Sequence, residues 1–410
     1  MKGAYIMSVT KCLIALCTIA LIASQTLTAV TAQALPDPPR SDRQPSSPST
    51  PRVMPLPESE WTAVHRDLIT KYTGDGQADN QLRTLLNVPA IVEGLMPLTV
   101  YLLEDSELSP RERHLLILRT AWLTGSQPIW ATQAARARTS VFTSEQIQHI
   151  AEGPSAPSWS RTEQTLLETA DQLFLNSSVT DETWTALSAH YNLFRLMEIV
   201  ETVNHFTVLA MIYNSFGVQP DSDTPDRLPS NVPYQIIVPK REPWLTEARV
   251  LPLEGDGIAV SRTFGQHPNL AQPRSRRANF INRVSNLTPH DREILILRIG
   301  WDCQAVYEWA KHVGTVGRAR DHGVDPTAVA EGPNASNVPE LNALLLRTVD
   351  ELYQNTSISD ATWDALTAEY TLADAMSAVY TPSSYRATSM SLNTYGVQLE
   401  AGDESFPDVR

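Results

Sequence analysis

Cysteine and basic residues are both scarce in this sequence. It has three cysteines in 410 residues, and Cys303 is the only one beyond the N-terminal segment that contains Cys12 and Cys17. If that segment is removed, no internal disulfide can form. Lysine and arginine total 32 against 46 acidic residues, which gives a formal net charge of −14. An acidic chain without basic runs lacks the electrostatic footprint of nucleic-acid binding, so we expect no nucleic-acid partner.

Long apolar runs are also missing after position 34. A transmembrane helix needs about 20 apolar residues, and no later segment offers them. The N-terminal segment carries two lysines, an apolar stretch over 12–23 and the small residues Ala32 and Ala34. This order is typical of a signal peptide. We therefore expect a signal peptide over 1–34, cut after Ala34, and a secreted or periplasmic protein with no membrane span in its mature chain.

Length and proline content divide the rest of the chain. A 410-residue chain is too long for one ordinary core and suits two domains. Stretches rich in proline are typical of linkers, and the sequence has two of them. The predicted order is a Pro/Ser-rich linker over 35–57, a first domain over 58–219, a Pro-rich linker over 220–243, a second domain over 244–400 and a tail over 401–410.

The two predicted domains contain an internal repeat. Residues 108–219 match 287–398 without a gap, and the offset in numbering is 301 − 122 = 179 for Trp301 and Trp122. The same offset relates Arg119 to Arg298. It also matches these pairs: Pro110 and Pro289, Trp130 and Trp309, Trp184 and Trp363, Gly217 and Gly396. The sequence therefore predicts two copies of one structural unit.

Each copy has the pattern of a helical unit. Ser109, Pro110 and Glu112 form a capping box with proline at the first helical position. Apolar residues then recur at helical spacing, whereas alternating strand patterns are scarce. We predict an all-α fold. In the second copy the expected helices cover 304–320, 340–353 and 360–369, followed by a final helix that Pro382 should kink or break.

Glu308 and His312 are the residues most suggestive of chemistry. Four residues apart on a predicted helix, they share one face. A carboxylate beside an imidazole orients it and raises its basicity, which suits proton transfer near neutral pH. The first copy has Ile129 and Gln133 at these positions. An exposed ion pair is the alternative. A closed cavity around the pair would favour an enzyme, and open solvent would favour a surface salt bridge.

Other kinds of site have weaker support. A catalytic zinc usually has three protein ligands, whereas the pair supplies two, and His290 and His322 are the nearest further candidates. We therefore expect no metal. Cys303 is best explained as a small buried apolar residue. The sequence has no glycine-rich phosphate loop and no nucleophile elbow, so we expect no cofactor.

The stretch from Trp301 to His312, together with the preceding 287–298, resembles the carboxymuconolactone decarboxylase family. This resemblance implies two tandem helical domains of the alkylhydroperoxidase D-like fold that associate as a homo-oligomer. The family has a decarboxylase branch, which uses Glu and His for proton transfer, and a hydroperoxidase branch, which uses a cysteine pair before the histidine. That pair is missing here, so a thiol-dependent hydroperoxidase is the less favoured alternative.

The resemblance implies an enzyme, carboxy-lyase-like and cofactor-independent, that decarboxylates a small lactone or β-keto-type acid, and the predicted signal peptide would make it an exported one. His312 would move the proton and Glu308 would orient it. The expected substrate-binding residues are Trp309, Tyr307, Trp301, Arg298 as a carboxylate anchor, and Tyr385. Trp301 and Arg298 have matches in the first copy, which equally fits structural roles. The alternatives are a non-catalytic binding or scaffold protein and a related isomerase or cyclase.

Overall fold

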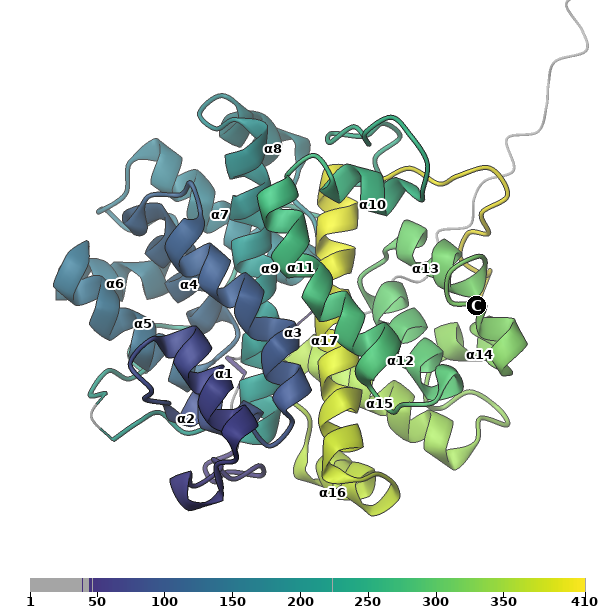
Figure 1. The fold of residues 1–410 in the computed structure, drawn as a ribbon. Helices are drawn as coiled ribbons and strands as arrows, with labels where there is room; N and C mark the ends of the chain where they lie inside the picture. Colours follow the sequence, from purple (N-terminus) through teal and green to yellow (C-terminus); the bar gives the residue numbers. More distant parts are fainter. Residues whose placement is uncertain (1–38, 40–43, 46, 223, 410) are drawn as a thin grey trace, which may run out of the picture. The chain divides into compact units, whose positions relative to one another are not determined.

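The computed structural model describes residues 39, 44–45, 47–222 and 224–409, so the predicted signal peptide lies outside the described residues. Within that range the chain forms helices joined by loops and has no strand (Figure 1). The predicted all-α class is confirmed. None of the described helices is both long and apolar enough to cross a membrane. The described residues form one compact unit that contains both predicted repeats.

The helices of the first repeat and its lead-in have the following bounds: η1 (Glu58–Glu60), α1 (Ala63–Thr73), α2 (Asn80–Leu85), α3 (Pro89–Val100), η2 (Tyr101–Asp105), α4 (Pro110–Leu123), α5 (Gln127–Ser140), α6 (Ser144–Glu152), α7 (Arg161–Asn176), α8 (Asp181–Ser188) and α9 (Leu193–Phe216). Those of the second repeat are α10 (Ala259–Phe264), α11 (Pro268–Asn279), η3 (Phe280–Val284), α12 (Pro289–Asp302), α13 (Val306–Val313), η4 (Ala319–His322), α14 (Pro326–Glu331), α15 (Glu340–Asn355), α16 (Asp360–Glu369) and α17 (Leu372–Tyr395).

Helix boundaries recur at the same offset as the sequence match. The starts of α4 and α12 are related by 289 − 110 = 179, and those of α9 and α17 by 372 − 193 = 179. The offset also relates α2 to α10 (259 − 80 = 179), upstream of the residues in which the sequence match was found. The structural correspondence is therefore longer than the sequence match.

Local sequence signals explain where the paired helices start and stop. Ser109 Oγ accepts a hydrogen bond from the Glu112 amide, and the Glu112 carboxylate accepts one from the Ser109 amide, which is the predicted capping box. Gly217 and Gly396 end the two long helices α9 and α17 at φ +68° and +67°. Only glycine adopts this left-handed conformation without steric cost.

The two repeats meet mainly through α9 and α17, which lie side by side at the centre of the fold, and through α3 and α11 (Figure 1). Pro382 was predicted to kink or break the final helix; it does not break it, because α17 runs unbroken from Leu372 to Tyr395. Proline within a helix costs about 3 kcal/mol. Nearly all of α17 is buried, and its packing on α9, α12 and α15 offsets that local cost.

Two arginines tie the repeats together reciprocally. Arg52, from the lead-in, donates to Asp360 Oδ1 at 2.6 Å and to the Ile358 carbonyl at 2.9 Å, both in the second repeat. Arg249, ahead of the second repeat, donates to Asp181 Oδ1 at 2.5 Å and to the Val179 carbonyl at 3.0 Å in the first. The acceptors correspond at the repeat offset (360 − 181 = 179 and 358 − 179 = 179), so the two contacts are related by the repeat.

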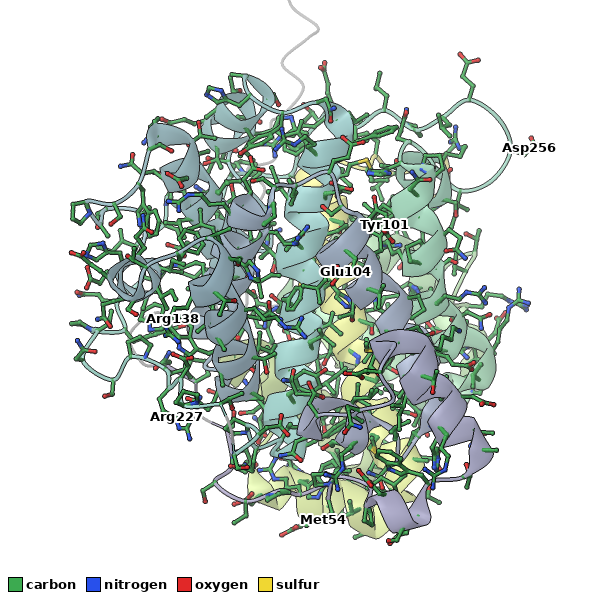
Figure 2. The ribbon with its side chains drawn as sticks, turned by 60° about the vertical axis from the view of Figure 1, so that its left-hand side comes forward. Met54, Tyr101, Glu104, Arg138, Arg227 and Asp256 are labelled. Atoms are coloured by element: carbon green, nitrogen blue, oxygen red, sulfur yellow. The ribbon has the colours of Figure 1, made fainter. Side chains whose placement is uncertain are left out.

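The segment between the repeats contacts both of them. The Tyr234 hydroxyl donates to the Leu123 carbonyl at 2.7 Å, and the Arg241 guanidinium donates to the Cys303 carbonyl at 2.8 Å. Arg138 and Arg227 lie on the same side of the first repeat (Figure 2), where Arg138 pairs with Asp226 of this segment. The segment is therefore anchored along its length.

Candidate functional site

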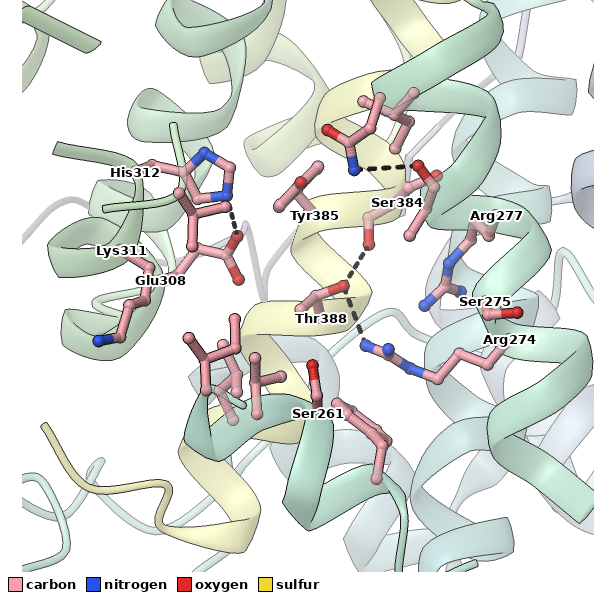
Figure 3. Close-up of a pocket in the computed structure, with 18 of the residues that line it drawn as sticks. Ser261, Arg274, Ser275, Arg277, Glu308, Lys311, His312, Ser384, Tyr385 and Thr388 are labelled. Atoms are coloured by element: carbon pink, nitrogen blue, oxygen red, sulfur yellow. Dashed lines mark hydrogen bonds and ion pairs between the residues drawn. The ribbon is translucent and has the colours of Figure 1, made fainter. Parts of the chain in front are cut away.

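A cavity of about 420 Å³ lies in the second repeat between α10, α11, α13 and α17. We call it the second-repeat cavity. Apolar side chains supply much of its wall, and its ionisable side chains come from two helices that face each other across it (Figure 3). Glu308, Lys311 and His312 lie on α13, and Arg274 and Arg277 on α11. The predicted pair therefore lies in a cavity rather than in open solvent.

His312 lies between two carboxylates. Its Nδ1 atom is 2.6 Å from Glu293 Oε2, and its Nε2 atom is 3.5 Å from Glu308 Oε1. The side chains of all three residues are at most 6% exposed. Because Glu293 accepts the hydrogen bond from Nδ1–H, the Nε2 atom of the neutral ring carries the lone pair and is available to Glu308 and the cavity.

Burial and the two carboxylates set the ionisation of this group. Burial raises the pKa of Glu308 to about 7, against the opposing attraction of His312. Burial alone would lower the pKa of His312, but Glu293 and Glu308 stabilise the imidazolium and raise it above its ordinary value. Burial would likewise raise the pKa of Glu293, yet His312 and Arg292 hold it low. Glu308 and His312 therefore form a buried pair that is suited to proton transfer.

Helix α13 is shorter than the helix that was predicted for this stretch. The prediction of one helix over 304–320 is wrong: α13 ends at Val313, and Gly314 follows it. The chain then turns so that Gly317 approaches the His312–Glu293 contact. A Cβ atom at Gly317 would overlap Glu293 Oε2 and lie 2.7 Å from His312 Nδ1. Only glycine leaves room for this hydrogen bond.

The opposite wall of the cavity is cationic. Arg277 is 2% exposed, and its Nη1 and Nη2 atoms have no hydrogen-bond partner among the described residues. Burial lowers its pKa to about 10, which still leaves it charged at neutral pH. Arg274 donates to Thr388 Oγ1 at 3.2 Å and lies 3.6 Å from Glu201 Oε2. A buried, unpartnered guanidinium is costly unless an anion pairs with it, so this wall suits an oxyanion.

Two of the predicted substrate-binding residues line the cavity and three do not. Tyr385 and Tyr307 line it, and the Tyr385 ring stands edge-on to His312 with the centroids 5.1 Å apart. Trp301 and Trp309 instead pack against each other and against Phe406 of the C-terminal tail, with ring centroids 5.1–5.8 Å apart. The two large rings are buried in this aromatic cluster. Neither of them lines the cavity.

Arg298 also lies away from the cavity. Its guanidinium donates to Asp350 at 2.6 Å and to the carbonyls of Val329 and Ala330. Arg119 makes the same contacts in the first repeat, with Asp171 and the carbonyls of Ile150 and Ala151. The prediction of a carboxylate anchor at Arg298 therefore finds no support in its contacts, because protein groups already satisfy this guanidinium.

Sequence reasoning missed Glu293, Arg274 and Arg277. A signal for the two arginines was available: at the repeat offset they face Leu95 and Leu98, so charge replaces an apolar residue as it does at Glu308. Glu293 has no such signal, because His114, itself ionisable, stands at its position in the first repeat.

The described part of the chain offers neither a cluster of metal-ligating side chains nor an accessible thiol. No group of three His, Cys, Asp or Glu side chains there is placed to hold a metal ion. Cys303 is buried, and burial raises the pKa of its thiol to about 11. A thiol of this kind is a poor nucleophile. His290 contacts neighbouring protein groups, and its Nδ1 atom donates to the His322 carbonyl at 2.9 Å.

Comparison with known proteins gives a family match in the first repeat. Residues 89–172 match the sequence model of the carboxymuconolactone decarboxylase family. The predicted family is thereby confirmed over those residues, in the repeat that lacks the Glu308–His312 pair. The motifs from which we predicted the family lie in the second repeat.

Two solved structures are similar to part of this chain. A protein of unknown function from Agrobacterium tumefaciens, ascribed to antioxidant defence as AhpD, is 18% identical over 34% of this chain and 96% of its own, with a TM-score of 0.33. An uncharacterized peroxidase-related protein from Silicibacter sp. is 12% identical over 46% of this chain and 98% of its own, with a TM-score of 0.37. The curated proteins give no match. Neither structural similarity decides the chemistry of the second-repeat cavity.

Proposed function

We propose that this chain is a cofactor-independent proton-transfer enzyme that decarboxylates a small lactone or β-keto-type acid. The observation that supports it best is the placement of Glu308 and His312, 3% and 5% exposed, in the wall of a cavity that also presents Arg277. Perturbed ionisable groups that meet in a cavity are typical of active sites. A solvent-facing pair would have favoured a non-catalytic protein instead.

The reaction needs a proton donor and a site for negative charge. The bond between the carboxylate carbon and its neighbour breaks, CO2 leaves, and the electron pair passes into the adjacent carbonyl to form an enolate. One proton then adds to the carbon that lost CO2, so each turnover consumes one proton. His312, whose pKa Glu293 and Glu308 raise against the effect of burial, would donate that proton through Nε2. Glu308 would return a proton to it.

The arginines would stabilise the negative charge of the substrate and of the enolate. Arg277 has two free guanidinium nitrogens in a largely apolar surrounding, where a charge-assisted hydrogen bond is stronger than in water. Arg274 is held by Thr388 and Glu201, so its position is set before the substrate binds. Tyr385 would cover the imidazole and exclude water.

A binding protein is the second candidate, and one observation favours it. The first repeat contains a cavity of similar size, about 400 Å³, in which Ile129 and Gln133 stand where the second has Glu308 and His312. A fold that keeps a cavity without the acid–base pair can bind without catalysis. The hydroperoxidase alternative gains nothing from the structure, since Cys303 is the only free cysteine among the described residues and is buried.

The test is turnover of a panel of small β-keto acids and lactone carboxylates by the full chain, measured as CO2 release. His312→Gln should lower kcat about 100- to 10,000-fold, the usual contribution of a general acid or base. The double variant Glu308→Ile with His312→Gln reproduces the first repeat's residues and should abolish turnover. His190→Gln, at an exposed histidine, is the control. Unchanged turnover by His312→Gln would refute the proposal, and binding without turnover would favour the binding protein.

Export and self-association are further proposals. N-terminal sequencing of the mature protein would test cleavage after Ala34, and an uncleaved N-terminus would contradict it. The mass of the protein in solution would test the homo-oligomer, and a monomer at all concentrations would contradict that.

A further inference from the structure

The first repeat has its own cavity at the place that corresponds to the site. We call it the first-repeat cavity; its volume is about 400 Å³. Ile129, Gln133, Phe206 and Leu209 line it. At the repeat offset these positions correspond to Glu308, His312, Tyr385 and Thr388, which line the second-repeat cavity. The two cavities therefore occupy equivalent places in the two repeats.

A polar side chain without a partner lies in the wall of the first-repeat cavity. Gln133 is 5% exposed, and its Oε1 atom has no hydrogen-bond partner among the described residues. The hydroxyl of Tyr72, which also lines this cavity, is in the same condition. Buried polar atoms are nearly always paired in folded proteins, so an unpaired acceptor in a cavity wall suits a ligand that donates a hydrogen bond.

The charge of this cavity is opposite to that of the other. Its charged lining residues are three acids and one base: Asp75, Asp79, Glu104 and Arg136. The second-repeat cavity has three lysine or arginine side chains, Arg274, Arg277 and Lys311, besides His312, with Glu308 as its only acid. Glu104 lies on the turn after α3 (Figure 2). An anion would be repelled where acids exceed bases, whereas a cation would be attracted.

We propose that the first-repeat cavity is a second ligand site, which takes a small organic cation with N–H donors on an apolar body. The donors would pair with Gln133 Oε1 and face the acidic side chains, and Ile129, Phe206 and Leu209 would cover the apolar body. No proton transfer takes place there, because Ile129 stands where the other repeat has Glu308. This inference is independent of the proposed function.

Benzamidine and benzoate form a matched pair of probes for the test, since they share size and shape and differ in charge. Binding of each to the full chain is measured by isothermal titration. Benzamidine should bind to the parent. Gln133→Leu should lower the affinity for benzamidine at least about tenfold, because the hydrogen-bond acceptor is lost. Asp79→Asn should lower the affinity for benzamidine several-fold, while the asparagine side chain still accepts the hydrogen bond from the Leu82 amide. Benzoate affinity should not change in either variant.

Changes in the other cavity give the reverse pattern. Arg277→Met should lower the affinity for benzoate and leave the affinity for benzamidine unchanged. Equal melting temperatures of Asp79→Asn and the parent would show that a lost affinity is not a lost fold. The proposal is overturned if benzamidine does not bind at millimolar concentration. It is also overturned if neither Gln133→Leu nor Asp79→Asn lowers the affinity for benzamidine, or if Gln133→Leu lowers the affinity for benzoate as much as that for benzamidine.

Discussion

The Nδ1 atom of His312 lies 2.6 Å from Oε2 of Glu293, a residue 19 positions earlier in the chain and on another helix. This contact joins α12 to α13 at the cavity and leaves Nε2 of the imidazole directed to Glu308. A carboxylate in this position fixes both the ring orientation and its tautomer. Glu293 is therefore a positioning residue, although it does not line the cavity itself.

Replacing Glu293 by Gln should lower the pKa of His312. The amide keeps a hydrogen-bond acceptor but removes the charge that most stabilises the imidazolium. NMR titration of the His312 ring measures the shift directly, without any substrate. Glu340→Gln, at an exposed carboxylate, is the control and should leave the titration unchanged. An unaltered His312 pKa in Glu293→Gln would show that the carboxylate has no electrostatic role.

Glu308 should make the protein less stable as the pH rises. Its pKa is raised from 4.5 to about 7 in the folded chain, so the folded state holds this proton more tightly than the unfolded state. Stability from the group is present below pH 4.5 and is lost as the pH rises to about 7. The shift corresponds to roughly 3 kcal/mol as an upper bound.

The measurement is thermal unfolding of the parent and Glu308→Gln across pH 4 to 8. The variant should melt at nearly the same temperature as the parent at pH 4.5, and several degrees higher at pH 8. A temperature difference that is constant with pH would contradict the raised pKa.

Gly317→Ala should break the contact between His312 and Glu293. The new methyl group would overlap the Glu293 carboxylate and lie 2.6 Å from the His312 carbonyl oxygen and 2.7 Å from His312 Nδ1, so the backbone or one of the two side chains must move. Turnover should then fall by at least about tenfold, since small misplacements of catalytic groups are costly. Gly314→Ala is the matched control, because the nearest atom to its added carbon is the Ala310 carbonyl oxygen at 3.0 Å. If both variants lose activity equally, backbone strain rather than the contact is responsible.

Glu201→Gln should weaken substrate binding from the other repeat. Glu201 lies on α9 of the first repeat, and its Oε2 atom is 3.6 Å from Nε of Arg274 in the second-repeat cavity. Loss of this charge should let Arg274 move and raise KM about three- to tenfold, with kcat little changed. Benzoate affinity offers the same readout without turnover. A fall in kcat with constant KM would contradict the positioning role.

The helical architecture could be predicted because its signals are local. Capping residues such as Ser109 and the terminal glycines Gly217 and Gly396 mark helix ends whatever surrounds them. The two errors arose where tertiary contacts dominate. Helix α17 stays continuous through Pro382 where it packs on α9, α12 and α15, and α13 ends before the turn that brings Gly317 close to His312.

The site could be predicted only in part, through the differences between the repeats. Glu308 and His312 stand out against Ile129 and Gln133. Periodicity shows that an aromatic ring is buried, but it does not show on which side of a helix the cavity lies. Trp309 therefore could not be distinguished from Tyr307, its neighbour but one, which does line the cavity.

Arg52 and Arg249 close the same junction from both sides, each reaching into the other repeat. In a symmetric pair of separate, identical chains, every substitution enters the assembly twice. Here the equivalent halves are covalently joined, so a change in one leaves its counterpart as it was. This freedom allows the second repeat to carry a buried acid–base pair and an Arg277 guanidinium without a partner, while the first repeat keeps Ile129 and Gln133 at the positions of the pair. The free-energy cost of burying these ionisable groups is thereby confined to the second repeat.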